Sequence, residues 1–439
     1  MASSGFLSIS GDTRTLAQER RRVLIASVIG SIFEWYDFVA YGIASALVFN
    51  KLFFPSANPL TGTIAAFGTY AVGYVARPLG GAIFGHFGDR TGRKAMLSLT
   101  LLIMGFGTFL IGCLPTYAQI GMWAPALLIL LRFLQGLGIG GEWGGSILMA
   151  VEFAPAGRRG LFGSLVQLGY PVGVIVSTVI FGIVSGLPQD AFLKWGWRIP
   201  FLISIFFVGA GLFIRLKLSE SPVFENATKR EPAIRMPLLE IFSHHRRTFF
   251  LAVGLKCSEI AFVSVATIVT ISYVTGHLGL PKTVILNGLL LAAGVELFTI
   301  PFFGWLSDLY GRRAMFFAGC LFSILFAFPE FRLLDTRDPT IIAITIALAV
   351  SLGQGIMFGP EAAWLSELFG TKLRYSGASL GFQLGGAISG GFTPLAAAVL
   401  MSWAGGATWP VSVLLIAVAC VTLLCAWLAP ETAKGDLQK

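Results

Sequence analysis

The sequence GHFGDRTGRK at residues 85–94 returns in altered form as GWLSDLYGRR at residues 304–313, and long apolar stretches flank both copies. The two copies are separated by half of the 439-residue chain. A short, charged, glycine-containing loop that repeats at the midpoint of an apolar chain indicates two related halves. Many secondary transporters are built from such halves, with the substrate site at their interface. The sequence therefore predicts a membrane protein that moves a small solute.

The composition argues against a soluble protein. Hydrophobic residues make up 55% of the chain and charged residues 12%, and the mean hydropathy is +0.80. Soluble domains are about one quarter charged, so a soluble fold could not bury this much apolar surface. The five cysteines lie in apolar stretches without the spacing of metal ligands. Because the sequence also lacks a phosphate-binding loop and a nucleophile elbow, we expect no enzyme and no cofactor, but a carrier driven by an ion gradient.

Twelve stretches are long and apolar enough to cross a membrane, which takes about 20 residues. In the first half they lie near residues 23–49, 61–84, 95–114, 121–151, 160–186 and 198–217. In the second half they lie near residues 248–275, 284–305, 314–333, 340–363, 377–401 and 409–429. The pattern predicts an all-α membrane protein with twelve transmembrane helices in two pseudo-symmetric six-helix bundles. The predicted divisions are a tail at 1–22, an N-terminal bundle at 23–217, a linker at 218–247, a C-terminal bundle at 248–429 and a tail at 430–439.

The positions of lysine and arginine predict the orientation. Basic residues gather before the first span, in the two repeated loops and in the linker at 218–247. Since such residues concentrate in cytoplasmic segments, we expect both termini in the cytoplasm of a bacterial inner membrane. The net charge of +9 follows from this topology, so we expect no nucleic-acid partner. We expect the protein to be a monomer in the lipid bilayer.

Three acids in the predicted spans of the first half are candidates for proton coupling. A charge at the bilayer centre costs at least about 2.5–3.5 kcal/mol, so each needs a partner or a wet cavity. Glu34 and Asp37 lie three residues apart and share one helix face. A poorly solvated carboxyl group holds a proton more readily than an exposed one. Glu142 lies among glycines that permit close helix packing. The alternative is that these acids are structural partners of arginines.

Basic and polar residues within the spans are candidates for substrate binding. Arg132 carries a permanent charge in mid-span, which suits an anionic substrate or a nearby acid. Lys256 and Glu259 lie three residues apart, so they either neutralise each other or line the cavity together. Buried polar side chains need partners, which a polar substrate can supply. The uncharged candidates of this kind are Tyr41, Trp143, Gln167, Tyr170 and Gln383.

A third group of residues is predicted to lock and release the two halves. Arg77 and Glu296 occupy equivalent positions before the two repeated loops, which suggests structural or gating pairs near the inner mouth. A second pair of loops repeats a pattern of an acid followed by an arginine. There we expect Glu152 to pair with Arg159 and, in the second copy, Glu367 to pair with Arg374. The repeated loops themselves contribute Asp89, Arg90, Arg93, Asp308 and Arg312.

These motifs resemble a known family. The loop GHFGDRTGRK is similar to the cytoplasmic loop between helices two and three of the major facilitator superfamily. Together with FEWYDFVAYG at 33–42 and LRFLQGLGIGGEWGG at 131–145, it resembles the metabolite:proton symporter branch. That branch includes permeases for shikimate, α-ketoglutarate and proline or betaine. The shikimate permeases are the most similar of these, through residues 46–54, 122–125 and 374–394.

The resemblance implies two six-helix bundles that open alternately to either side and import a solute with protons. Carried over by position, Glu34, Asp37, Arg132 and Glu142 match charged positions shared across the branch, which suggests coupling more than selectivity. We therefore expect a proton-coupled importer of a small organic acid such as shikimate.

Three other readings remain open. The substrate could be a dicarboxylate or tricarboxylate such as α-ketoglutarate or citrate. It could be a zwitterion such as proline or betaine, for which an aromatic cage involving Trp35, Trp143 and Trp364 is expected. The third reading is a membrane receptor or scaffold that transports nothing.

Overall fold

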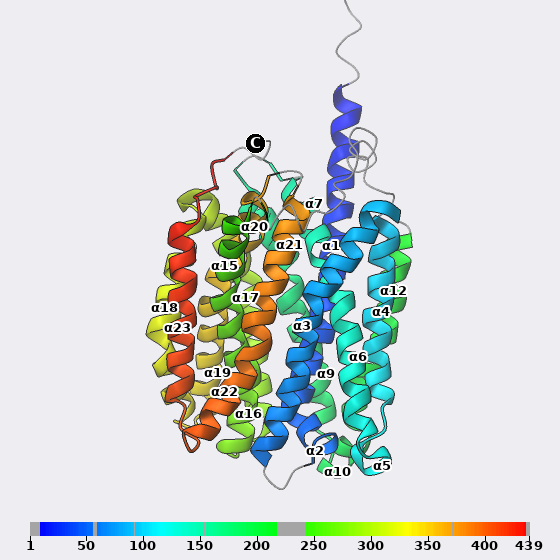
Figure 1. The fold of residues 1–439 in the computed structure, drawn as a ribbon, viewed down its shortest axis with the longest axis vertical. Helices are drawn as coiled ribbons and strands as arrows, with labels where there is room; N and C mark the ends of the chain where they lie inside the picture. Colours follow the sequence, from blue (N-terminus) through cyan, green and yellow to red (C-terminus); the bar gives the residue numbers. More distant parts are fainter. Residues whose placement is uncertain are drawn as a thin grey trace, which may run out of the picture.

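The computed structural model describes residues 9–55, 59–91, 93–152, 154–155, 157–216, 243, 245–370 and 373–435. Within these ranges the protein is helical and contains no strand, and the helices run along the long axis of the molecule (Figure 1). The start of the first helix and the C-terminal segment lie at the same end. We call this end the termini side and the other end the opposite side.

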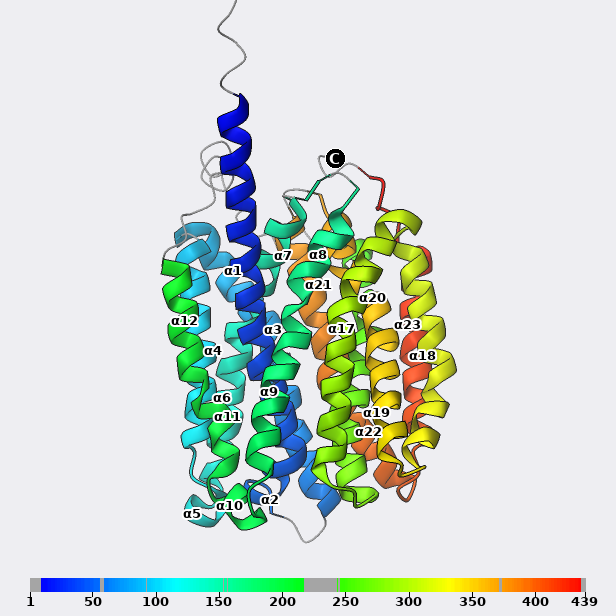
Figure 2. The ribbon, with the colours of Figure 1, turned by 180° about the vertical axis from the view of Figure 1, so that it is seen from behind.

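Six membrane-crossing segments form the first half. They are α1 (Ile9–Ala44) continued by η1 (Ser45–Phe49) and α2 (Asn50–Leu52); α3 (Pro59–Thr91); α4 (Arg93–Cys113); α6 (Trp123–Gly140) with α7 (Trp143–Glu152); α8 (Arg159–Gln167) with α9 (Gly169–Ser185); and η2 (Gly196–Arg198) with α11 (Ile199–Leu202) and α12 (Ser204–Leu216). Two short helices, α5 (Tyr117–Ile120) and α10 (Gln189–Lys194), lie on the opposite side (Figure 2).

Six further segments form the second half. They are α15 (Arg246–Ser264) continued by η3 (Val265–Val269), α16 (Thr270–Ser272) and η4 (Tyr273–His277); α17 (Lys282–Tyr310); α18 (Arg312–Leu334); α19 (Pro339–Leu348) with η5 (Ala349–Gln354) and α20 (Gly355–Glu367); α21 (Arg374–Gly385) with η6 (Gly386–Gly391) and α22 (Phe392–Trp403); and α23 (Trp409–Leu428). Several segments contain π-helical turns, which often mark functional sites in helices.

The structure confirms the predicted all-α fold. Ten helices in the described ranges are long and apolar enough to span a membrane, and residues 98–113 form a shorter apolar helix within α4. With α3, which packs along α6, these make the twelve expected segments. The boundary of the first helix differs from expectation, because α1 begins at Ile9 and extends past the bundle. Residues 15–22 are rich in good helix formers. The predicted linker at 218–247 lies outside the described residues except for 243 and 245–247.

Two helix pairs form the seam between the halves. In one, α8 and α9 pack against α17, and in the other, α3 packs against α21, η6 and α22. Figure 2 shows α9 and α17 side by side at the middle of the molecule. On the termini side the backbones approach closely, because a Cβ atom on Gly160 of α8 would overlap the carbonyl oxygen of Gly304 of α17. Glycine permits this approach, which closes the termini side.

Gly160→Leu is expected to prevent closure of the termini side, since its side chain would occupy the space of α17. We predict a larger mean distance between spin labels placed at Arg158 and Tyr310, two exposed residues of different halves. The measurement is pulsed electron resonance in lipid nanodiscs. Gly182→Leu is the matched control, because no atom lies within 4 Å of a Cβ at that position of α9. An unchanged distance in Gly160→Leu would contradict the proposed close contact.

Candidate functional site: a cavity between the halves, closed on the termini side

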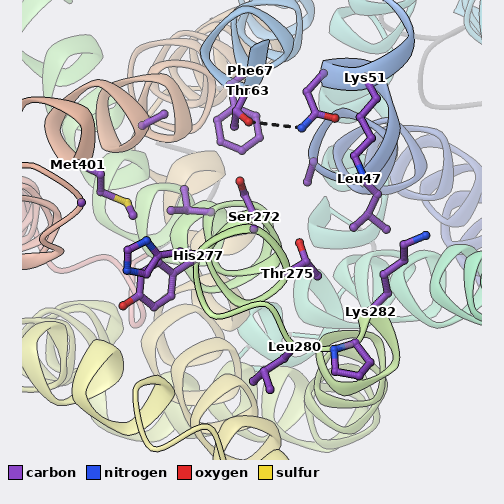
Figure 3. Close-up of a pocket in the computed structure, with 18 of the residues that line it drawn as sticks. Leu47, Lys51, Thr63, Phe67, Ser272, Thr275, His277, Leu280, Lys282 and Met401 are labelled. Atoms are coloured by element: carbon purple, nitrogen blue, oxygen red, sulfur yellow. Dashed lines mark hydrogen bonds between the residues drawn. The ribbon is translucent and has the colours of Figure 1, made fainter. Parts of the chain in front are cut away.

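A cavity of about 640 Å³ lies between the halves on the opposite side (Figure 3). Residues of η1, α2 and α3 line it from the first half, and residues of η3, η4, α17 and α22 line it from the second. Lys51 and His277 in its wall are exposed, so the cavity is continuous with solvent. Its described lining contains Lys51, His277 and Lys282 but no aspartate or glutamate. The entrance is therefore positively charged.

A smaller cavity of about 40 Å³, which we call the central cavity, lies deeper in the seam. Aromatic residues from α1, α3 and α9 form much of its wall, and apolar residues of α15, η3 and α17 complete it. The aromatic residues are Trp35, Phe38, Tyr70, Tyr74 and Tyr170. Only Tyr170 among these was a predicted site residue, since aromatic residues in membrane helices give no sequence signal that separates a cavity wall from ordinary packing.

Two buried arginines lie against this aromatic wall. The guanidinium carbons of Arg77 and Arg132 lie 3.9 and 4.2 Å from the ring centroid of Phe38. Arg77 also packs over Tyr74, and Arg132 over Tyr41 at 3.9 Å. The Nε and Nη2 atoms of both arginines have no hydrogen-bond partner among the described residues. Four charged donor atoms thus lie against the aromatic wall, although neither arginine lines the cavity itself.

One of these arginines is held by a chain of hydrogen bonds. Arg132 Nη1 donates to Gln135 Oε1 at 2.5 Å, and Gln135 Nε2 donates to Thr108 Oγ1 at 2.6 Å. The buried carboxyl group of Asp37 lies beside Thr108 and within electrostatic reach of Arg132 and Glu142. Asp37 thus lies near Arg132, but the hydrogen bond of Arg132 goes to Gln135 and not to this acid. Glu34, the third predicted acid, is also buried in this half.

The second half contains a buried cation shared by two acids. Lys256 Nζ lies 2.5 Å from Glu259 Oε2 and 3.0 Å from Glu361 Oε2. The ammonium group also packs over the rings of Phe358 and Phe382. Of the two readings left open by the sequence, mutual neutralisation describes this geometry, because Lys256 faces carboxylates and not the central cavity. Glu361 was not among the predicted site residues.

The expected location of Arg77 and Glu296 near the inner mouth is wrong. Arg77 packs on rings that line the central cavity, and Glu296 lies near Tyr170 of the same wall and near Glu259. Both carboxyl oxygens of Glu296 lack a hydrogen-bond partner within the described part of the chain. Both residues therefore lie beside the cavity wall, from equivalent positions of α3 and α17, and not at the inner mouth.

The predicted uncharged residues divide between the cavity and the seam. Gln167 Nε2 donates to the carbonyl oxygen of Phe358 at 2.5 Å, which joins the halves. Trp143 stacks on Phe382 with ring centroids 3.7 Å apart, again across the halves. Tyr41 donates to Thr69 Oγ1 at 2.6 Å. The amide of Gln383 is buried, with neither polar atom bonded to a described residue. Gln167 and Trp143 therefore join the halves and do not line the central cavity.

An acid of the second half caps a helix of the first half on the termini side. The two oxygens of Asp308 accept hydrogen bonds from the backbone N–H groups of Gly160 and Leu161, at 2.8 and 3.0 Å. These groups begin α8, where the helix dipole favours negative charge. Arg312 Nη1 also donates to Asp308 Oδ1, at 2.8 Å, and Arg312 binds Glu367 as well. The second repeated loop thus makes the contact between halves that the sequence predicted.

The expected partners of the second loop pair are exchanged between the halves. Glu152 lies 3.4 Å from Arg374, not beside Arg159, and Glu367 lies 3.0 Å from Arg312 and 4.0 Å from Arg159. Each acid therefore has an arginine partner in the other half, because the two loops meet across the seam. Among the remaining predicted gating residues, the side chains of Asp89, Arg90 and Arg93 lie outside the described residues.

The C-terminal segment completes the closure of the termini side. Glu431 accepts hydrogen bonds from the backbone N–H groups of Arg312 and Arg313 at the start of α18. Arg159 of the first half donates to the carbonyl oxygen of Gly435 at 2.8 Å. Partial burial acts to raise the pKa of the Glu431 carboxyl group, but the backbone hydrogen bonds outweigh it and hold its pKa below the ordinary value. The segment therefore binds both halves at neutral pH.

Comparison with known families decides the class of protein. The model of the Major Facilitator Superfamily matches residues 23–389 and 260–439. The chain belongs to the major facilitator superfamily. Members are built as this structure is, and the relatives described below are transporters, so the chain is a membrane transporter and not an enzyme.

Relatives of this superfamily member share most of its length. It is 40% identical over 436 residues to the shikimate transporter of Escherichia coli, covering 98% of this chain and 100% of the relative. The proline/betaine transporter of Escherichia coli is 32% identical, covering 95% and 85%. The xylose transporter XylE from E. coli in a partially occluded inward open conformation superposes with a TM-score of 0.73 at 18% identity, covering 95% and 99%. This last likeness concerns the fold alone.

Lys256→Met is expected to destabilise this transporter, because it leaves Glu259 and Glu361 buried without a cation. Removing one partner of a buried ion pair costs about 3–5 kcal/mol. We predict a lower midpoint of thermal unfolding in detergent at pH 8, where the acids are least able to take up protons. Adding Glu259→Gln and Glu361→Gln to the same chain is expected to restore most of the midpoint. A single variant as stable as the triple variant would contradict the shared-cation geometry.

Proposed function

We propose that this transporter imports a small organic acid, shikimate or a related carboxylate, together with protons. The observation that carries the proposal is the pair of buried arginines beside the central cavity. Four of their N–H-bearing nitrogens lack a partner among the described residues. Leaving charged donors buried and unbonded is costly. A carboxylate that entered the cavity would supply acceptors in the fork geometry that arginine binds best.

The entrance supports an anionic substrate. Lys51 and Lys282 reach the same side of the cavity from different halves (Figure 3), and the described lining has no acid to neutralise them. Lys282 Nζ is held by a hydrogen bond to Gln189 Oε1 at 3.1 Å. A cleft lined by one sign of charge raises the local concentration of ions of the opposite sign. The same charge would repel a cationic solute.

The balance of buried charge supports proton coupling. Away from the termini side, where the buried Arg312 and Arg374 pair with acids, three basic residues are fully buried in the described spans: Arg77, Arg132 and Lys256. The buried acids among the described residues are more than twice as many: Glu34, Asp37, Glu142, Glu259, Glu296, Glu330 and Glu361. Ionisation of all of them would leave a net negative charge in the membrane interior, which is strongly unfavourable. Protonation of some of these acids would remove this charge, which supports proton exchange by the protein.

The direction of transport follows from the positions of the basic residues in the sequence. With both termini in the cytoplasm of a bacterial inner membrane, as the basic residues favour, the closed termini side faces inward and the cavity faces outward. The structure then corresponds to the state that receives a substrate from outside. Opening the seam at α8 and α17 would release it, and the working unit is the monomer.

A zwitterion such as proline or betaine is the second candidate, favoured by the aromatic wall of the central cavity. An aromatic cage binds a quaternary ammonium through the faces of its rings. Here the rings of Phe38 and Tyr74 already contact guanidinium groups. Of the tryptophans expected in a cage, only Trp35 lines the cavity, since Trp143 stacks in the seam and Trp364 donates to the carbonyl oxygen of Pro430. The organic acid is therefore the better supported substrate.

Uptake of radiolabelled shikimate into proteoliposomes with an imposed inward proton gradient tests the proposal. We expect accumulation that an ionophore abolishes and that unlabelled shikimate competes better than citrate, α-ketoglutarate or betaine. Arg132→Gln is expected to raise KM by about 30-fold or more, since losing a buried charge contact costs at least about 2 kcal/mol. Arg332→Gln, at an exposed position, is the control. Uptake that persists without the gradient, or best competition by betaine, would exclude this function.

Lys51→Gln combined with Lys282→Gln tests the charge of the entrance. We expect the double variant to raise KM several-fold at low salt with little change in kcat, because the lysines attract the anion but do not take part in the conformational cycle. The difference from the wild type should shrink as salt screens the charges. Lys194→Gln changes an exposed lysine that does not line the cavity and is the matched control. An equal increase in KM in the double variant and in Lys194→Gln would rule out a local role of Lys51 and Lys282 at the entrance.

A further inference from the structure

We infer that the coupling proton binds in the second half, on the cluster of Lys256, Glu259 and Glu361 together with the neighbouring Glu296, and not on the acids of the first half. This inference rests on the proposed proton coupling and names the site that performs it. It differs from the expectation drawn from the sequence, which assigned the proton to Glu34, Asp37 and Glu142.

The first argument is the ratio of charges in the cluster. One ammonium group lies within 3.0 Å of oxygens from two carboxyl groups, on α15 and α20. The second oxygens, Glu259 Oε1 and Glu361 Oε1, have no partner among the described residues. A single positive charge neutralises one carboxylate. The other carboxyl group is therefore either protonated or a buried, unneutralised charge, and the second state is strongly unfavourable.

The second argument is Glu296, which adds a third carboxyl group from α17. It is fully buried, its neighbours include the acid Glu259, and neither of its oxygens is bonded within the described ranges. In an apolar surrounding the neutral, protonated form of such a group is favoured. A proton on Glu296 removes the repulsion with Glu259, and its loss restores that repulsion. The electrostatic repulsion between Glu296 and Glu259 thus depends on whether Glu296 holds a proton.

The groups that face the cluster from neighbouring elements do not replace the missing cation. From the first half, α9 contributes Tyr170 and α3 contributes Tyr74, both of which lie within electrostatic reach of Glu259. Their hydroxyl groups are neutral at physiological pH. Gln354 of η5, which lies near Glu259, is a neutral amide. Arg77, the cation nearest to Tyr74 in the first half, packs on the aromatic wall.

The cluster is connected to both the cavity and the seam through one residue. The ring of Phe358 packs against Lys256 on one side and against Trp35 and Tyr170 of the cavity wall on the other. The carbonyl oxygen of Phe358 accepts the hydrogen bond from Gln167 that joins the halves. A change in the charge of the cluster therefore acts on the substrate cavity and on the seam together. This is the linkage that a symporter requires.

Asp37, an acid of the first half, has neighbours of a different kind. Asp37 lies beside Thr108 and near Arg132, a cation whose charge is permanent. A carboxyl group near such a cation is stabilised as the anion. Asp37 therefore has a hydrogen-bond partner and a nearby cation, neither of which is found for Glu296 among the described residues.

Glu296→Gln tests the inference, because glutamine imitates the protonated acid and cannot release a proton. We expect the variant to exchange external labelled shikimate for internal shikimate within about two-fold of the wild-type rate. We expect accumulation driven by a proton gradient to fall by at least ten-fold. Glu330→Gln is the matched control, since it is a buried glutamate of the same half, on α18, that does not line either cavity. It should retain both activities.

Asp37→Asn in the same assays distinguishes the two locations. Gradient-driven accumulation that survives in Glu296→Gln and fails in Asp37→Asn would overturn the inference while leaving proton coupling intact. Wild-type accumulation without any dependence on the gradient would instead overturn the proposed function, and the inference with it.

A second measurement does not depend on transport. The infrared carbonyl band of protonated carboxylic acids in the purified protein should lose amplitude in Glu296→Gln and decline with rising pH in the wild type. An amplitude equal to that of the wild type in Glu296→Gln would overturn the inference.

Discussion

The cost of burying charge in a membrane is the constraint on which the interior of this protein depends. The two halves meet it by different chemistry. In the first half, Arg77 and Arg132 lie on aromatic rings that stabilise a cation but supply few hydrogen-bond acceptors. In the second half, Lys256 binds two carboxyl groups, and the carboxyl groups are in excess. The first half thus has arginine donors without acceptors, and the second half has carboxyl oxygens without donors. These are the complementary needs of a site for an organic anion and a site for a proton.

The contact that closes the termini side is suited to repeated breaking. Asp308 binds the first N–H groups of α8, which carry the positive end of the helix dipole. When the seam opens, water can satisfy both partners, so neither helix has to unfold. The close approach of Gly160 and Gly304 adds contact area that is lost at once when the helices separate. Closure therefore depends on many moderate interactions at one place, a construction that permits two states of similar energy.

The sequence predicted the architecture well and the partners less well. The apolar runs and the repeated loop gave the all-α fold, and Asp308 and Arg312 lie at the seam as expected. The arginine partners of Glu152 and Glu367 were exchanged, because a pattern within one loop does not show which loop it will meet. Likewise, a polar residue such as Gln167 in a span can face a cavity or another helix, and only the packing of the two halves decides. The sequence did not predict the aromatic wall, since phenylalanine and tyrosine occur throughout the chain.

The position of Phe358 explains how opposite needs of the two halves can be met in one cycle. Its ring separates Lys256 from the aromatic wall of the cavity, and its carbonyl oxygen holds Gln167 of the other half. A ring in this place cannot move toward the cavity without loosening its contact with the ammonium group, and it cannot move away without straining the hydrogen bond across the seam. Because interiors are densely packed, such a residue moves between discrete positions and not continuously. Binding of substrate in the cavity and a change in the protonation of the acids around Lys256 would then both move Phe358. Neither event alone would open the termini side.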